Sequence, residues 1–210
     1  MDIRTLSGEN PEALEAALRQ QFGGLDAYVW PGQPQDGKET LHAAPVHQVL
    51  DFVQEMADKV CRIIDPRSTV RIKPDRDNRT EVLVIIRSRN TGAFIGWHGQ
   101  TLDAVELLLN AIVSQHLGLR LDITADIDQY RRKRASFLEA LVKRTVREIE
   151  HDHTERPLRG LLPKERRYVH TLMADHPYLT TESRGRGGKR TLFITPRKEF
   201  AAGETEDGGE

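Results

Sequence analysis

The stretch that decides the fold runs Ile95-Gly96-Trp97-His98-Gly99-Gln100-Thr101-Leu102-Asp103. Two glycines three residues apart let the backbone approach a ligand closely and present amide groups at the positive end of a following helix. That geometry suits the phosphate backbone of a nucleic acid. A GxxG tetrad alone more often marks a glycine turn before an ordinary helix, so the elements around it decide the interpretation.

The elements around this loop follow a recognisable order of helix, strand, strand, short helix, glycine loop, helix and strand. Apolar residues recur at helical spacing before and after the loop, and the strands between them are short and apolar. Leu117-Gly118 ends the helix that follows the loop. The pattern predicts helices over 46–61, 91–95 and 102–117 and strands over 70–73, 82–86 and 119–123.

This order resembles a KH domain of type II, in which the GxxG loop clamps about four nucleotides of single strand. The match covers roughly residues 46–126, and the resemblance implies that the loop binds nucleic acid through Gly96, Trp97, His98, Gly99 and Gln100. Trp and His stand where the family usually places Arg or Lys, so the loop lacks a permanent cation. Either Trp97 stacks on a base and His98 makes a pH-dependent contact, or this domain serves mainly as an interaction surface.

Composition bounds the class of protein. The chain has 210 residues, of which 30% are charged and 6% aromatic, so its cores must be built from Leu, Ile and Val. Cys61 is the only cysteine, which argues against a disulfide framework and a cysteine metal site. No stretch approaches the roughly 18 apolar residues of a membrane span, and no signal sequence is evident. We expect a cytoplasmic protein without membrane insertion.

Charge is divided unevenly along the chain. Residues 131–198 hold 18 Lys and Arg against 8 Asp and Glu, a formal charge of +10, while the remainder holds 13 against 24, or −11. An isolated run of basic residues is as often simply the solvent-exposed face of a helix as it is a ligand-binding site. A basic block of this size beside an acidic remainder, however, is typical of a surface that binds a polyanion.

The first 45 residues are the least informative. Asn10-Pro11 is a good start for a helix with an apolar stripe that ends at Phe22, and 27–30 predicts a short strand. The Pro- and Gly-rich segment 31–38 is interpreted as a linker. Trp30 is expected to anchor this region to an apolar surface rather than to stack on a base.

The basic block begins with a long helix from Tyr130, whose cluster Arg131 to Arg134 lies too early to favour the helix dipole and is better explained by a partner. A second helix starts at Pro163 and places Arg166 and His170 four residues apart on one face. Strands over 178–183 and 191–195 then enclose a glycine-rich tip that can fit phosphates. The cationic candidates for nucleic-acid contact are Arg166, Arg167, His170, Arg184, Arg186, Lys189 and Arg190.

Residues 130–198 resemble the small domain named after its Arg-x-x-x-His motif, which binds single-stranded nucleic acid. A KH domain followed by this domain through a Tyr-Arg-x-x-Arg helix, here Tyr130 to Arg134, resembles the Jag family, also called KhpB or SpoIIIJ-associated protein. The resemblance implies a bacterial RNA-binding protein linked to post-transcriptional control of cell envelope growth and division. It also implies a small KH-domain partner protein.

The expected fold is therefore α+β, with a type II KH domain and a small α+β domain of the Arg-x-x-x-His type. The expected domains are an N-terminal segment with a degenerate or truncated Jag N-terminal region (1–45), the KH domain (46–126), the linking helix and second domain (127–198) and a disordered acidic tail (199–210). The expected ligand is single-stranded RNA, with single-stranded DNA as the alternative. No heptad pattern settles the oligomeric state.

The sequence also bears on two other classes of function. A hydrolase or nuclease would need a metal, or a base paired with a nucleophile, and no such pair stands at motif spacing. His151-Asp152-His153 carries ligand types, but adjacent residues on a helix end point in different directions. We therefore expect no catalytic residue, metal or cofactor. The remaining alternative is an adaptor that pairs with another KH protein or with the membrane-insertion machinery and retains only residual nucleic-acid binding.

Overall fold

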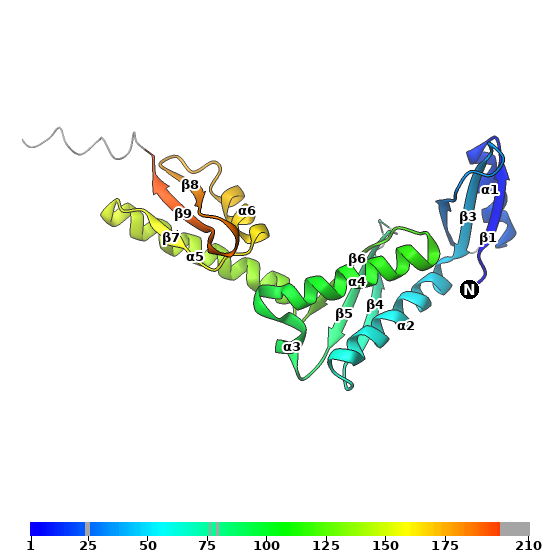
Figure 1. Ribbon diagram of the computed structural model, residues 1–210, viewed down its shortest axis with the longest axis horizontal. Helices are drawn as coiled ribbons and strands as arrows, with labels where there is room; N and C mark the ends of the chain where they lie inside the picture. Colours follow the sequence, from blue (N-terminus) through cyan, green and yellow to red (C-terminus); the bar gives the residue numbers. More distant parts are fainter. Residues whose placement is uncertain (24–25, 76, 79, 198–210) are drawn as a thin grey trace, which may run out of the picture. The chain divides into compact units, whose positions relative to one another are not determined.

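A computed structural model describes residues 1–23, 26–75, 77–78 and 80–197. The chain divides into two compact units, Met1–Tyr130 and Arg131–Glu210 (Figure 1). The fold class is α+β, as the sequence predicted. The acidic tail predicted for residues 199–210 lies outside the described residues.

The first unit opens with a small antiparallel sheet and one helix. Its elements are β1 (Arg4–Gly8), α1 (Pro11–Gln21), β2 (Ala27–Pro31) and β3 (Glu39–Pro45), and the strand order is β1-β3-β2. The side chain of Asn10 caps α1 by accepting hydrogen bonds from the backbone of Glu12 and Ala13, as predicted. The segment 31–38, interpreted as a linker, instead connects the two paired strands of a β2–β3 hairpin.

Trp30 anchors this sheet, as predicted from the sequence. Only 4% of the residue is exposed, and it lies in the main hydrophobic cluster of the unit together with residues of α2 and α4. The sheet formed by residues 4–45 therefore contributes to the same core as the elements that follow it.

The following elements, residues 46–127, are here called the KH-type unit. They are α2 (Val46–Ile64), β4 (Thr69–Pro74), β5 (Glu81–Arg87), α3 (Thr91–Ile95), the single turn η1 (Trp97–Gly99), α4 (Gln100–Leu117) and β6 (Asp122–Ile127). In the sheet β4-β5-β6, β4 runs antiparallel and β6 parallel to β5. Parallel neighbours need a crossover, which α3 and α4 provide. The predicted order of elements is confirmed, but β6 begins three residues later than expected, because Leu119 is buried in the core before the pairing starts.

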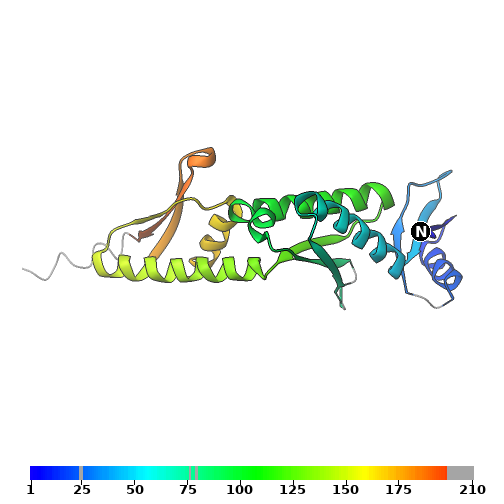
Figure 2. The same cartoon turned by 90° about the horizontal axis from the view of Figure 1, so that it is seen from below.

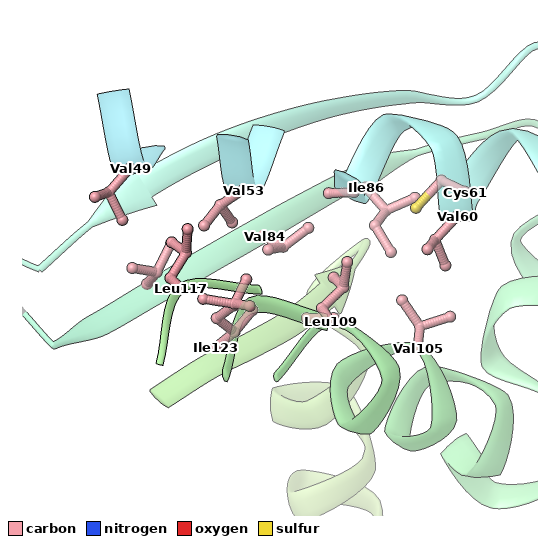
Figure 3. Close-up of a cluster of buried hydrophobic side chains, with 14 of the residues drawn as sticks. Val49, Val53, Val60, Cys61, Val84, Ile86, Val105, Leu109, Leu117 and Ile123 are labelled. Carbon is pink, nitrogen blue, oxygen red and sulfur yellow. The ribbon is translucent and has the colours of Figure 1, made fainter. Parts of the chain in front are cut away.

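The core of the KH-type unit lies between its two long helices and one face of the sheet (Figure 3). Alternate residues of β5 face the helices, so Val82, Val84 and Ile86 are buried. The labelled side chains come from α2, β5, α4 and β6, and they are Val49, Val53, Val60, Cys61, Val84, Ile86, Val105, Leu109, Leu117 and Ile123. Burial raises the pKa of the Cys61 thiol to about 11, so this cysteine is a packing residue rather than a nucleophile.

The second unit packs one sheet against two helices (Figure 2). Its elements are α5 (Tyr130–Asp152, whose first residue belongs to the first unit), β7 (Arg156–Leu158), α6 (Pro163–Leu172), β8 (Leu179–Arg184), the turn η2 (Gly187–Lys189) and β9 (Thr191–Pro196). The antiparallel strand order is β7-β9-β8. Leu138, Ile149, Val169, Leu192 and Ile194 are buried together. Among the described residues, no helix is both long and apolar enough to cross a membrane.

Candidate nucleic-acid interface

The loop between α3 and α4 has a backbone that requires its two glycines. Gly96 has φ +64° and Gly99 has φ +89°, in the region that residues with a side chain rarely adopt. A Cβ atom on Gly96 would also collide with Oγ1 of Thr101. His98 between them has a positive φ as well, of 53°. The loop is therefore held in one tight shape at the start of α4.

Gly99 has a second constraint that the sequence did not reveal. A Cβ atom there would lie 2.8 Å from Cε1 of Tyr130, the first residue of α5. The phenol ring thus lies directly against the backbone of the loop, and it also packs against the core of the KH-type unit. The second glycine is needed for this packing as well as for its φ angle.

The two residues in the middle of the loop form a small aromatic surface. The rings of Trp97 and His98 stack, with centroids 4.3 Å apart and planes at 24°. Trp97 is 57% exposed, although most large aromatic side chains of the described chain are buried or half-buried. Gln100 is exposed at the first position of α4. The loop therefore presents an aromatic face beside the positive end of an 18-residue helix.

In the second unit, α6 and the β8–β9 hairpin enclose a hollow of about 370 Å³. We call it the basic hollow. Four of its lining residues are arginines or histidine that the sequence predicted to contact nucleic acid. The others have hydroxyl or apolar side chains. The lining residues are Pro163, Arg166, Arg167, His170, Thr181, Ser183, Arg190 and Leu192.

Hydrogen bonds fix part of this lining and leave part of it available. Nδ1 of His170 and Oγ1 of Thr181 are 2.5 Å apart, and Nη1 of Arg166 donates to the carbonyl oxygen of Leu161 at 2.7 Å. The side chains of Arg167 and Arg190 make no hydrogen bond or ion pair with any other described residue. The arrangement can therefore present two unneutralised guanidinium groups to phosphate oxygens, beside an oriented imidazole.

The sequence interpretation missed Thr181 and Ser183. Both lie on β8, two residues apart, so their side chains point to the same face of the sheet. The period of two was visible in the sequence, but the register with β9 that aims this face toward α6 was not.

Arg184 follows Ser183 and therefore points to the opposite face of the sheet. Nη1 donates to both carboxylate oxygens of Glu155 at 2.9 and 3.0 Å, Nε donates to Glu182 at 2.7 Å, and the guanidinium lies 4.6 Å from the ring centroid of Phe193. These contacts raise the pKa of Arg184 and, chiefly through the hydrogen bond from Arg184, lower that of Glu155. Of the predicted hairpin cations, Arg190 joins the basic hollow, Arg186 and Lys189 lie exposed at the tip around η2, and Arg184 is engaged within the fold.

Arg134 is likewise engaged within the fold, which corrects the expectation that the whole 131–134 cluster serves a partner. Its Nε donates to Oε1 of Glu165 at 2.7 Å, and its guanidinium lies 5.1 Å from the ring centroid of Phe137. The other oxygen of Glu165 accepts from the backbone of Leu162 at 2.8 Å, so this nearly buried carboxylate caps α6. Arg134 thereby helps to position the helix that carries Arg166, Arg167 and His170.

His151 is the second-last residue of α5, and His153 follows directly after the end of this helix. Within the described residues, no group of three or more His, Cys, Asp or Glu side chains is placed to hold a metal ion. Asp152 instead pairs with Arg156 and accepts from the backbone of Thr154 at 3.0 Å, which closes the end of α5.

Comparison with known proteins finds relatives with sequence similarity to this chain. Residues 136–196 match the domain family named after the Arg-x-x-x-His motif. An RNA-binding protein KhpB of Clostridium symbiosum is 25% identical over 162 residues, which cover 77% of this chain and 69% of that protein. The RNA-binding protein KhpB of Bacillus subtilis is 24% identical over 156 residues, covering 73% and 72%. That of Lactiplantibacillus plantarum is 31% identical over 107 residues, covering 51% of this chain and 33% of the relative. The chain is thus similar to these KhpB proteins over about three quarters of its length, and it combines the matched domain with a KH-like order of elements before it.

Proposed function

We propose that this chain is a non-catalytic RNA-binding protein that takes single-stranded RNA through two modules, the KH domain (46–126) and the Arg-x-x-x-His domain (127–198). The observation that carries the proposal is the basic hollow, where α6 and the β8–β9 hairpin bring Arg166, Arg167, His170 and Arg190 together. The hollow lies in the residues that match the Arg-x-x-x-His domain family, and the relatives are named RNA-binding proteins.

In the second module, Arg167 and Arg190 would contact phosphate oxygens, because charge-assisted hydrogen bonds from guanidinium are strong and directional. Thr181, Ser183 and His170 would supply polar contacts to sugar or base within the same hollow. Arg186 and Lys189 at the hairpin tip would contact further phosphates where the RNA strand leaves the basic hollow.

In the KH module, the backbone of Gly96 to Gln100 would hold the strand while the exposed face of Trp97 stacks on a base. Stacking on one aromatic side chain contributes about 1–3 kcal/mol and requires an unstacked base. This requirement favours single strands over duplex. Because every base has a π face, the stacking itself does not distinguish RNA from DNA, and single-stranded DNA is the competing ligand.

Fluorescence anisotropy tests the second module. The full chain is titrated against labelled single-stranded RNA, single-stranded DNA and duplex RNA over a salt series. The double variant Arg167→Ala/Arg190→Ala is compared with Arg147→Ala/Arg159→Ala, which removes the same charge from exposed positions outside the hollow. We expect the first pair to lose about 10-fold in affinity, about 1.4 kcal/mol, and the control pair to lose much less. Equal losses would mean that net charge, not the hollow, drives binding.

A matched pair of variants tests the loop. His98→Asp places a carboxylate where a phosphate would approach, whereas His98→Asn has nearly the same shape without the charge, and both residue types tolerate the positive φ at this position. We expect Asp, but not Asn, to weaken binding. Trp97 fluorescence should also quench on addition of single-stranded RNA in a Trp30→Phe background, and an unchanged signal would count against stacking.

We further propose that binding serves bacterial post-transcriptional regulation linked to cell envelope growth and division, as the family resemblance implies. The test is recovery of the bound RNAs by crosslinking in cells. Transcripts for envelope and division proteins should be enriched with the unmodified chain and lost with Arg167→Ala/Arg190→Ala. Recovery of an unselected set of transcripts would contradict this role.

A second candidate function is an adaptor that pairs with a small KH-domain protein or with the membrane-insertion machinery. One observation favours it: Leu107 and Leu108 on α4 are 73% and 47% exposed, and Ala104 and Ala111 share this face. Adjacent exposed apolar side chains are typical of a protein-binding surface. Affinity capture with and without ribonuclease separates the two functions. A partner that survives digestion and is lost in Leu107→Glu supports the adaptor.

A further inference from the structure

The KH-type unit has a second polar hollow that the sequence interpretation did not include. It measures about 710 Å³ and is lined by Asp65, Arg67, Arg89 and Asn90. Asp65 and Arg67 belong to the turn between α2 and β4, and Arg89 and Asn90 to the connection between β5 and α3. Figure 1 shows these two connections at the same end of the unit. We call this feature the end hollow.

Hydrogen bonds join the two connections that line the end hollow. Oδ2 of Asp65 accepts from Oγ of Ser88 at 2.5 Å, and Oδ1 accepts from the backbone of Arg67 at 2.9 Å. Oγ of Ser88 in turn accepts from the backbone of Asn90 at 2.9 Å. Both oxygens of the carboxylate are therefore used within the fold.

The remaining side chains of the end hollow keep their hydrogen-bond donors available to a ligand. The side chains of Arg67, Arg89 and Asn90 make no hydrogen bond or ion pair with another described residue. Asn90 precedes α3 at a position where its side chain could cap the helix, but it does not do so. The hollow holds two guanidinium groups against the single carboxylate of Asp65, which interacts electrostatically with Arg67. This excess of positive charge suits an anion.

The end hollow lies close to the GxxG loop along the chain. Only α3, of five residues, separates Asn90 from Gly96. At 1.5 Å per residue this helix is about 7.5 Å long, a distance comparable to the reach of one nucleotide. A single strand held by the loop can therefore extend along α3 to Arg67 and Arg89.

We propose that the end hollow is a further phosphate-binding site, which takes the backbone of the same single strand beyond the nucleotides clamped by the GxxG loop. Arg67 and Arg89 bind the phosphate oxygens, and the Asn90 amide donates to phosphate or sugar. This inference rests on the proposed function of the loop and extends the length of strand that the KH module contacts.

Oligonucleotide length tests the proposal in the full chain. Arg167→Ala/Arg190→Ala is used as the background so that the basic hollow contributes little. In it, Arg67→Ala/Arg89→Ala is compared with Arg71→Ala/Arg120→Ala, two exposed arginines of the same unit outside the end hollow. Because a GxxG loop clamps about four nucleotides, a tetranucleotide should not fill the end hollow, whereas an octanucleotide should.

We expect Arg67→Ala/Arg89→Ala to weaken octanucleotide binding about 10-fold and tetranucleotide binding less than 2-fold, with little change in the control. The slope of log K against log salt for the octanucleotide should become shallower by about 0.7 for each phosphate that the variant no longer neutralises. Equal losses in both double variants, or equal losses at both lengths, overturn the proposal. So does an octanucleotide that no longer binds the background protein, because the KH module then contributes nothing. If the unmodified chain binds no single strand, the proposed function itself fails. The series therefore separates this failure from a failure of the end-hollow proposal alone.

Discussion

Two independent features of the structure require a glycine at position 99. Its φ of +89° is unfavourable for a residue with a side chain, and the ring of Tyr130 leaves no space for a Cβ atom. The sequence predicted the glycine turn because GxxG is a local signal. It could not predict the ring, because Tyr130 is separated from the loop by α4 and β6 and reaches it only in the folded chain.

Gly99→Ala should therefore destabilise the protein by at least about 2 kcal/mol, from left-handed backbone strain and the clash with the ring. Gly92→Ala is the matched control, since Gly92 lies in α3, has no atom within 4 Å of a built Cβ and has no positive φ. Alanine there should be neutral or stabilising. Urea unfolding measures both. Equal costs would show that neither the φ angle nor Tyr130 matters.

Arg184 illustrates a cation whose role is internal to the fold. Hydrogen bonding from Arg184 lowers the pKa of Glu155 below its ordinary value of 4.5. A carboxylate with a lowered folded pKa contributes stability above its unfolded value, and this contribution is lost as the pH falls through the folded value. The ion pair should therefore stabilise the second unit at neutral pH and not at strongly acidic pH.

Arg184→Met should lower stability at pH 7, and the difference from the unmodified chain should shrink as the pH falls below 4.5. Binding of single-stranded RNA at pH 7 should change less than 2-fold, because Arg184 lies on the sheet face opposite the basic hollow. Urea unfolding across pH and anisotropy at pH 7 provide the two measurements. A loss of RNA affinity as large as that expected for Arg167→Ala/Arg190→Ala would show that Arg184 contacts the RNA.

At the scale of elements, α5 and α6 are joined by the contact between Arg134 and Glu165. Only 5% of the Glu165 side chain and 21% of the Arg134 side chain are exposed. Removing the carboxylate takes away the acceptor of the hydrogen bonds from Arg134 and from the backbone N–H of Leu162, and the loss of one member of a buried pair is costly.

Glu165→Ala should thus destabilise the chain by about 2–4 kcal/mol. Glu148→Ala is the control within the same unit, since 42% of the Glu148 side chain and 79% of that of its partner Arg144 are exposed and its second partner, Arg156, lies 3.9 Å away. The cost of this change should be much smaller. Thermal and urea unfolding compare the two. Equal effects would mean that the contact between α5 and α6 does not depend on Glu165.

The elements that could be predicted are those with strong local patterns. α2, α4 and α6 carry apolar stripes, a proline start or a glycine stop, and β5 and β9 are short apolar runs. β1, β3 and β7 were missed because they are short or poor in β-branched residues, and their stability comes from partners far along the chain, as in the pairing of Arg4 with Ala43. The basic hollow shows the same limit: its arginines could be chosen from composition and spacing, but Thr181 and Ser183 depended on strand register.

At the scale of the whole molecule, charge is segregated between a basic second module and an acidic remainder. Residues 199–210, outside the described part, include the carboxylates Glu199, Glu204, Glu206, Asp207 and Glu210. Near the basic module they would compete with phosphates through a long-range, salt-screened interaction. Deleting 199–210 should tighten RNA binding most at low salt, as measured by anisotropy over a salt series. An unchanged affinity would contradict this competition.

Two modules on one chain predict a specific dependence on RNA length. A hexanucleotide engages one module at a time, so loss of the weaker module should barely change its affinity. A 30-mer can engage both, and the second contact then forms at a high effective concentration, which raises affinity by about 10²–10⁴ if the geometry permits. We therefore compare His98→Asp with Arg167→Ala/Arg190→Ala on both RNAs. Whichever variant affects the hexanucleotide less should still lose at least 10-fold on the 30-mer. If that variant is harmless on both, the modules bind independently, and the weaker one is better studied as a protein-binding surface.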